Sequence, residues 1–226
     1  MIAAALATAP VSAAQPPVCA ASLASQLTST RASSQVVTVL AATARSTTGV
    51  LMLWERADGC WQEAGGPFHA YLGLAGVSDD HREGDGTTPA GSYAIGPTLY
   101  GVDPDPHYHY PYRRIGCGDW WDENPASPGY NTLRHVPCGA IPALGAPRAL
   151  LRGPVRAYAH FAFIEYNTDP VVPGRGSAIF LHADLGHPTT GCISLPLSQL
   201  DKVLAWLRPA AHPRMVIGTA AGILGY

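Results

Sequence analysis

Residues 179–194 read IFLHADLGHPTTGCIS, and this stretch decides both the fold and the chemistry expected of the chain. Its first residues are apolar and predict a buried strand that ends near His182. A loop that contains Gly186 and Pro188 then leads back to Cys192. A loop that joins two strand ends can bring an imidazole within reach of a thiol. Because the thiolate is the form of cysteine that attacks, the stretch predicts a nucleophilic Cys192 with His182 as its base.

The backbone just before the cysteine forms the second part of the predicted site. The successive N–H groups of Thr190, Gly191 and Cys192 can form an oxyanion hole for a tetrahedral intermediate, and Gly191 lets the backbone approach a substrate closely. Two other interpretations stay open, namely a buried inert Cys192 and a satisfied core histidine at His182. His187 could join them in a zinc site, but only three ligands are local, so no metal is predicted.

Downstream of this stretch, the sequence predicts one amphipathic helix. Four leucine and valine residues follow the i, i+3, i+4, i+7 spacing of a single apolar face, namely Leu200, Val203, Leu204 and Leu207. Ser198 and Asp201 resemble a capping box at its start, and Pro209 ends the run.

Upstream, the chain is mostly a succession of short strands. Apolar or alternating segments predict strands at residues 36–40, 49–56, 60–63, 69–74, 92–95, 159–166, 178–183 and 215–218. Asp58-Gly59 is a hairpin signal between two of them. Residues 97–140 are rich in Pro, Gly, Asp and aromatic residues, and a segment this long with little periodicity predicts an ordered, functional loop. The pattern predicts a single, mostly β domain with few helices.

Three features outside the first stretch also carry predictions. Asp85 is expected to shape its turn by accepting a backbone hydrogen bond with its carboxylate. Trp120 and Trp121 could line a substrate groove, or they could pack together as a satellite hydrophobic cluster under a loop. His160 could face the cleft beside the strand of His182 or belong to the core.

The composition excludes several classes of protein. Charged residues make up 13% of the chain, against a usual ~25%, which excludes a coiled coil and a charge-driven disordered chain. The net charge of −2 provides no basic footprint for nucleic acid. Residues 1–30 hold a short apolar run and a small-residue site, which predict a signal-peptide remnant and tail before a domain at 31–226. An alanine-rich leader of a cytosolic protein is the alternative, and the run is too short to span a membrane.

The five cysteines indicate how an exported chain would be cross-linked. Cysteines of exported proteins usually pair, but an odd number cannot pair completely. We predict Cys19–Cys60 and Cys117–Cys138 disulfides, which leaves Cys192 unpaired as a reactive thiol.

Several motifs together resemble the L,D-transpeptidase catalytic domain family (the YkuD-like domain). Residues 83–93, EGDGTTPAGSY, are similar to the D-G-x-T-P-x-G turn of that family, and residues 189–192, TTGC, are similar to its Ser/Thr-His-Gly-Cys segment. Residues 120–132 and 165–167 resemble its secreted actinobacterial-type branch. The resemblance runs from about residue 34 to the C-terminus. It implies a single β-sandwich or mixed-sheet domain with one clear α-helix after the catalytic cysteine.

The resemblance also implies a reaction. Cys192 would attack a peptidoglycan donor stem after the diamino acid at its third position, and His182 would be the general base, oriented by the carbonyl of Ala183. The amine of a second stem would then resolve the thioester into a 3→3 cross-link. The implied partners are peptidoglycan stem peptides, with carbapenem-type β-lactams as inhibitors, in the cell envelope. No metal or organic cofactor is implied.

Two positions depart from the family pattern. Thr190 stands where the family has histidine, and Ser194 stands where it has Arg or Asn. Thr190 and Gly191 are expected to supply the oxyanion hole, and Thr189 and Ser194 to position the substrate. Because of these departures, hydrolysis of the same stem bond and a catalytically inactive wall-binding role both stay open as alternatives.

Overall fold

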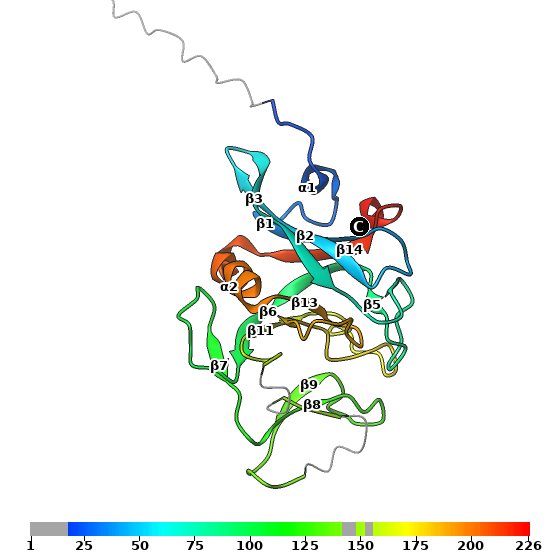
Figure 1. Cartoon of the computed structure of the whole chain (residues 1–226), viewed down its shortest axis with the longest axis vertical. Coiled ribbons are helices and arrows are strands. Elements are labelled where there is room, and N and C mark those ends of the chain that lie inside the picture. The colour runs from blue at the N-terminus through cyan, green and yellow to red at the C-terminus, as the bar shows by residue number, and fades with distance from the viewer. Residues whose placement is uncertain (1–17, 142–147, 152–155) are drawn as a thin grey trace, which may run out of the picture.

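The computed structural model describes residues 18–141, 148–151 and 156–226, and β-strands dominate this part of the chain (Figure 1). The helices are α1 (Leu23–Gln26), α2 (Leu197–Trp206), η1 (Pro209–Ala211) and η2 (Ile223–Gly225). The strands are β1 (Gln35–Ala41), β2 (Thr48–Ala57), β3 (Cys60–Tyr71), β4 (Val77–Ser78), β5 (Thr88–Pro89), β6 (Gly91–Gly101), β7 (Tyr112–Arg114), β8 (Asp119–Asp122), β9 (Thr132–His135), β10 (Arg148–Leu150), β11 (Phe161–Ile164), β12 (Phe180–Ala183), β13 (Ile193–Leu195) and β14 (Arg214–Thr219). The mostly β fold class is therefore confirmed.

Nine strands form one mixed sheet in the order β11-β12-β13-β3-β2-β1-β14-β6-β7. The β1–β14, β12–β13 and β6–β7 pairs are parallel, and the other pairs in this order are antiparallel. The start of β6 pairs with β14, whereas its second half pairs with β11. Strand β6 runs well beyond the predicted residues 92–95, and this extension lets it join the two ends of the sheet. The sheet therefore curls around its apolar side chains instead of lying flat.

The hairpin between β2 and β3 follows directly from its turn residues. Asp58 and Gly59 have φ angles of 51° and 81°, so both lie in the left-handed region. Two such residues make the type I′ turn whose twist matches that of paired strands. Ala57 pairs with Cys60 on either side of this turn, as the Asp-Gly signal predicts.

Helix α2 packs on β12 and β13, the two strands that flank the loop between His182 and Cys192. The predicted apolar face is buried, because Leu200, Val203, Leu204 and Leu207 are all fully inaccessible. The predicted capping box is wrong: the helix begins at Leu197, with Pro196 as its N-cap, and no side chain caps it. Asp201 instead lies 2.9 Å from Nδ1 of His160, which removes it from any capping role.

A smaller sheet, in the order β10-β8-β9, lies apart from the main sheet at the lower end of Figure 1. Trp121 on β8 is buried with its ring centroid 4.6 Å from that of Phe163 and 5.1 Å from that of Phe180. This contact makes Trp121 part of a satellite core that joins the two sheets. The segment 97–140 is thus partly regular, since it holds the end of β6 together with β7, β8 and β9.

Both predicted disulfides are present, Cys19–Cys60 and Cys117–Cys138. Cys192 is a free thiol, as the odd cysteine count predicts. Of the predicted leader and tail, residues 1–17 lie outside the described residues, and residues 18–30 contain α1. Within the described part of the chain, no helix is both long and apolar enough to cross a membrane.

Candidate functional site

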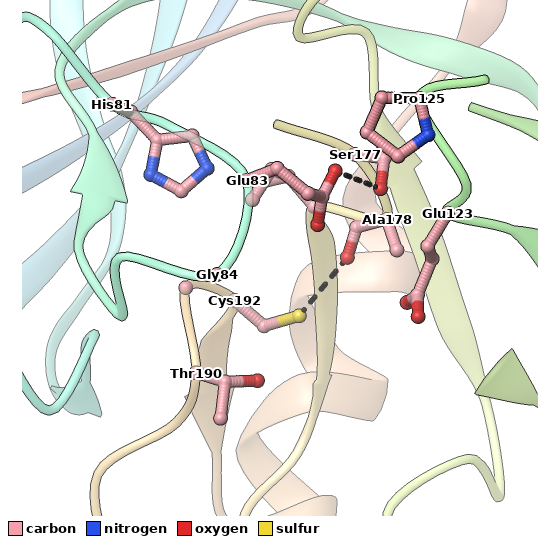
Figure 2. Close-up of a pocket in the computed structure, with 11 residues that line it drawn as sticks. His81, Glu83, Gly84, Glu123, Pro125, Ser177, Ala178, Thr190 and Cys192 are labelled. Carbon is pink, nitrogen blue, oxygen red and sulfur yellow. Dashed lines mark hydrogen bonds between the residues drawn. The ribbon is translucent and has the colours of Figure 1, made fainter. Parts of the chain in front are cut away.

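The parallel pair of β12 and β13 fixes the position of Cys192. Leu181 pairs with Ile193, so Cys192, one residue earlier, lies beside Phe180. The amide of Phe180 donates to Sγ of Cys192 at 3.4 Å. The thiol in turn donates to the carbonyl of Ala178 at 3.3 Å (Figure 2). The thiol is therefore held by backbone groups at the entrance to β12.

The thiol of Cys192 is neutral in this arrangement. Burial raises its pKa to about 12; the amide of Phe180 opposes this shift, and the charge of Glu123 adds to it. A buried thiolate would lose most of its hydration, and one amide does not replace it. The Cys192 thiol would therefore need a base in order to act as a nucleophile, because the resting protein does not hold it as thiolate.

His182 on β12 is buried, and its ring is oriented by the backbone. Its Nδ1 lies 2.8 Å from the carbonyl oxygen of Ala183, as the family resemblance implies. Because a carbonyl only accepts hydrogen bonds, Nδ1 carries the proton and Nε2 keeps a free lone pair. Burial lowers the pKa of His182, while the Ala183 carbonyl and the charge of Asp184 partly oppose this shift. The imidazole is thus neutral and able to accept a proton.

His182 and Cys192 border the same small cavity of about 210 Å³, together with the Tyr158 ring, whose centroid is 5.5 Å from that of His182. Among the described residues, no hydrogen bond joins the imidazole to the thiol, whose proton is directed at Ala178. Catalytic hydrogen bonds are often loose without substrate and tighten when it binds. A rotation of the thiol toward His182 would complete the pair.

The predicted oxyanion amides are arranged unequally. Gly191 donates its N–H to Oγ1 of Thr189 at 3.1 Å, whereas the amides of Thr190 and Cys192 have no acceptor among the described residues. Gly191 has a φ of 147°, and a Cβ there would lie 3.0 Å from the carbonyl oxygen of Thr87. Glycine is therefore required here for the backbone to pass its neighbour, and the free amides are those on either side of it.

Thr189 and Ser194 play different structural parts. Oγ1 of Thr189 donates to the carbonyl of Cys192 at 2.6 Å and accepts from Gly191, which closes the turn before the cysteine. Ser194 pairs with His182 across the strands, lines the small cavity, and has a buried Oγ without a partner. An unsatisfied buried hydroxyl at this place is suited to meet a polar group of a ligand.

A second, larger cavity of about 510 Å³ opens on the other side of Cys192, and its walls are acidic (Figure 2). Glu83 lies in the predicted D-G-x-T-P turn and accepts from the Tyr130 hydroxyl and from Oγ of Ser177 at 2.7 Å. Glu123, the residue after β8, enters from the opposite wall. Sequence reasoning missed the placement of both glutamates, because no local pattern links their loops to Cys192.

His81 completes this larger cavity and is also absent from the predicted site. Its Nδ1 lies 3.0 Å from both Oδ1 of Asp85 and Oγ1 of Thr87, and burial is the main cause of its lowered pKa. Asp85 accepts from the amides of Thr87 at 2.8 Å and Arg82 at 2.7 Å, which confirms its predicted role in the turn. The turn thereby brings both His81 and Glu83 to the cavity that Cys192 lines.

Two other histidines, His187 and His160, have different surroundings. Nδ1 of His187 lies 2.8 Å from the carbonyl of its neighbour Pro188, and within the described residues no three His, Cys, Asp or Glu side chains are grouped to hold a metal. His160 packs edge-on to the rings of Tyr108 and Tyr112 and pairs with Asp201, as a core histidine would.

Comparison with known proteins identifies the family of this chain. The search of curated proteins found no match. Among solved structures, the helical cell shape determining protein Pgp2 from Campylobacter jejuni is similar, with 16% identity and a TM-score of 0.38. The match covers 82% of this chain but only 48% of that one, so the chain spans about half of its length. The model of the L,D-transpeptidase catalytic domain family (YkuD) matches residues 39–217. The chain therefore belongs to the L,D-transpeptidase catalytic domain family.

Proposed function

We propose that the chain is a peptidoglycan L,D-transpeptidase that forms 3→3 cross-links through a thioester on Cys192. The observation that carries the proposal is a free thiol between two cavities, one of which it shares with an imidazole held in the proton-accepting tautomer. Membership of the L,D-transpeptidase family supplies the substrate class, which is the stem peptide of peptidoglycan.

The first half of the reaction makes the thioester. As a donor stem binds, the thiol proton moves to Nε2 of His182, and Sγ of Cys192 attacks the carbonyl carbon of the third residue, a diamino acid. The amides of Thr190 and Cys192 stabilise the oxyanion, with Gly191 contributing if Thr189 releases its N–H. The C–N bond then breaks, the leaving D-amino acid takes the proton from His182, and the acyl group stays on sulfur.

The second half transfers the acyl group. The amine of an acceptor stem attacks the thioester, the C–S bond breaks, and the 3→3 linkage forms. The unpartnered hydroxyl of Ser194 and the turn residue Thr189 are the proposed positioning groups beside the site.

Residues 31–226 would form the catalytic unit, and residues 1–30 would be a leader and tail. The two disulfides support an exported, envelope-located protein, since such bonds persist in oxidising compartments.

Mass spectrometry after incubation with a carbapenem tests the nucleophile. The wild type should gain one covalent adduct, which Cys192→Ala should abolish and His182→Ala should slow by about two orders of magnitude or more, since a positioned base contributes that much. Thermal unfolding of both variants is the control for folding. A folded wild type that forms no adduct, or an adduct that persists in Cys192→Ala, would refute the proposal and favour an inactive wall-binding role.

Product analysis then separates transfer from hydrolysis. Purified stem peptides are incubated with and without an acceptor amine, and the products are resolved by mass. Cross-linked dimers that need the acceptor are expected. Release of the shortened stem alone, at a rate independent of the acceptor, would show an L,D-carboxypeptidase instead.

A further inference from the structure

Glu123 is the one acidic side chain in the larger cavity that nothing in the described chain holds in place. It follows β8 and reaches into the cavity beside the hydrogen bond between Cys192 and Ala178, across from Glu83 (Figure 2). Glu83 is bound by Tyr130 and Ser177, whereas no hydrogen bond or ion pair to Glu123 exists among the described residues. A partly buried carboxyl without a partner is costly, so its presence beside the thiol calls for a ligand.

Among the described residues, acidic groups and a histidine surround Glu123. Glu83 and His81 face it from the turn before β5, Asp122 precedes it on β8, and Cys192 and Tyr158 lie within its electrostatic reach. No lysine or arginine lines this cavity in the described chain. Burial, followed by the charges of Glu83 and Asp122, raises the pKa of Glu123 to about 7. The carboxyl therefore gains and loses a proton close to neutral pH.

This position opposes the first half of the proposed reaction. The charge of Glu123 raises the pKa of the Cys192 thiol, so it works against formation of the thiolate. The second half has the opposite requirement. An alkylamine acceptor arrives as an ammonium ion at neutral pH, since such amines ordinarily titrate near 10.4, and it cannot attack until it loses a proton. A carboxylate beside the thioester would both attract that cation and accept its proton.

We propose that Glu123 is a further catalytic residue, which binds the ammonium group of the acceptor and deprotonates it. This inference rests on the function proposed above. The carboxylate takes one proton, the freed lone pair forms the new C–N bond to the thioester carbon, and the C–S bond breaks. The departing sulfur takes the second proton from the amine through His182, which restores the thiol. The proton on Glu123 leaves to solvent, so one ammonium and one thioester give one amide, one thiol and one proton.

The experiment measures the two half-reactions separately in the wild type, Glu123→Gln and Glu123→Asp. Formation of the acyl-enzyme from a donor stem should not slow in Glu123→Gln, because a charge that opposes the thiolate is removed. Transfer to an alkylammonium acceptor should fall by about 10²-fold or more, mostly in kcat, with partial recovery in Glu123→Asp. Glu63→Gln, an exposed glutamate on β3, is the matched control and should behave as wild type.

A neutral acceptor distinguishes proton removal from a structural role. Hydroxylamine is uncharged at neutral pH, so Glu123→Gln should transfer to it as fast as the wild type does. Equal losses with both acceptors, or no loss with the alkylammonium acceptor, would overturn the inference while leaving the thioester mechanism intact. A wild-type thioester that only water resolves would overturn it too. A wild type that forms no thioester would instead refute the proposed function itself.

Discussion

At the scale of single residues, the site holds Cys192 and His182, the proposed reacting groups, in their neutral forms. Burial raises the pKa of the Cys192 thiol and lowers that of the His182 imidazole, and both shifts penalise the charged form. An ion pair of thiolate and imidazolium is therefore not the resting state. We therefore expect substrate binding to promote the proton transfer from Cys192 to His182, so that the thiol becomes reactive only when the cavities are occupied.

The rate of acylation should depend on pH through His182. Only the neutral imidazole accepts the thiol proton, so the rate rises with pH through the pKa of His182, which burial places below the ordinary 6.5. Asp184→Asn removes a charge that raises this pKa, so the acidic limb should move to still lower pH. Carbapenem adduct formation followed from about pH 4 to pH 8 checks this, since that range includes the ~pH 5–8 region where histidine usually titrates. A limb above 6.5, or an upward shift in the variant, would contradict the proposed base.

At the scale of elements, β12, β13 and α2 form the support of the site. The parallel register sets Cys192 beside Phe180 and Ser194 beside His182, and α2 packs behind both strands. The spacing of its leucines and valine predicts the buried face of α2 correctly. The capping box fails because Ser198 lies inside the helix, where its side chain caps no amide.

Two substitutions in α2 distinguish the contribution of its buried face to stability from that of the predicted N-cap. Leu204→Ala should lower the free energy of unfolding by about 2–5 kcal/mol, because Leu204 is fully buried in the main core. Ser198→Ala should change it by less than about 0.5 kcal/mol, as at a surface position without a special contact. Urea denaturation of both variants gives the comparison. A loss of about 1 kcal/mol or more in Ser198→Ala would restore the capping role that the geometry denies.

At the scale of the whole molecule, the smaller sheet delivers Glu123 to the larger cavity. The Cys117–Cys138 disulfide closes the chain around β8 and β9, whereas Cys19–Cys60 joins the N-terminal segment to the start of β3. The Cys117–Cys138 disulfide therefore constrains the segment that carries Glu123 to the site. The Cys19–Cys60 disulfide constrains the opposite end of the main sheet.

Removal of each disulfide should have different effects on activity. The loops closed by the two bridges span 21 and 41 residues, so each pair of Cys→Ser substitutions should cost roughly 3–4 kcal/mol of stability. Transfer to an alkylammonium acceptor should fall only in the Cys117→Ser/Cys138→Ser variant, because only that loop carries Glu123. Unfolding and transfer rates of the two double variants provide the measurement. Equal activity losses would mean that both act through general destabilisation.

Local patterns were enough to predict most strands of the main sheet, the Asp58-Gly59 hairpin, the buried face of α2, both disulfides and the neighbourhood of His182 and Cys192, whereas the short strands β4, β5, β7 to β10 and β13 were not predicted. Each correct prediction depends on residues close together in the chain, on a backbone conformation that few residue types adopt, or on the pairing of cysteines. The acidic cavity could not be predicted in this way, because Glu83, Glu123 and Cys192 come from separate loops. Their proximity depends on how the two sheets pack, and the same packing buries Glu123 and Cys192 and thereby raises the pKa values of these two groups. The local sequence thus predicts Cys192 and His182 as the nucleophile and its base, while long-range packing sets the charge states of these two groups and adds the carboxyl group beside them.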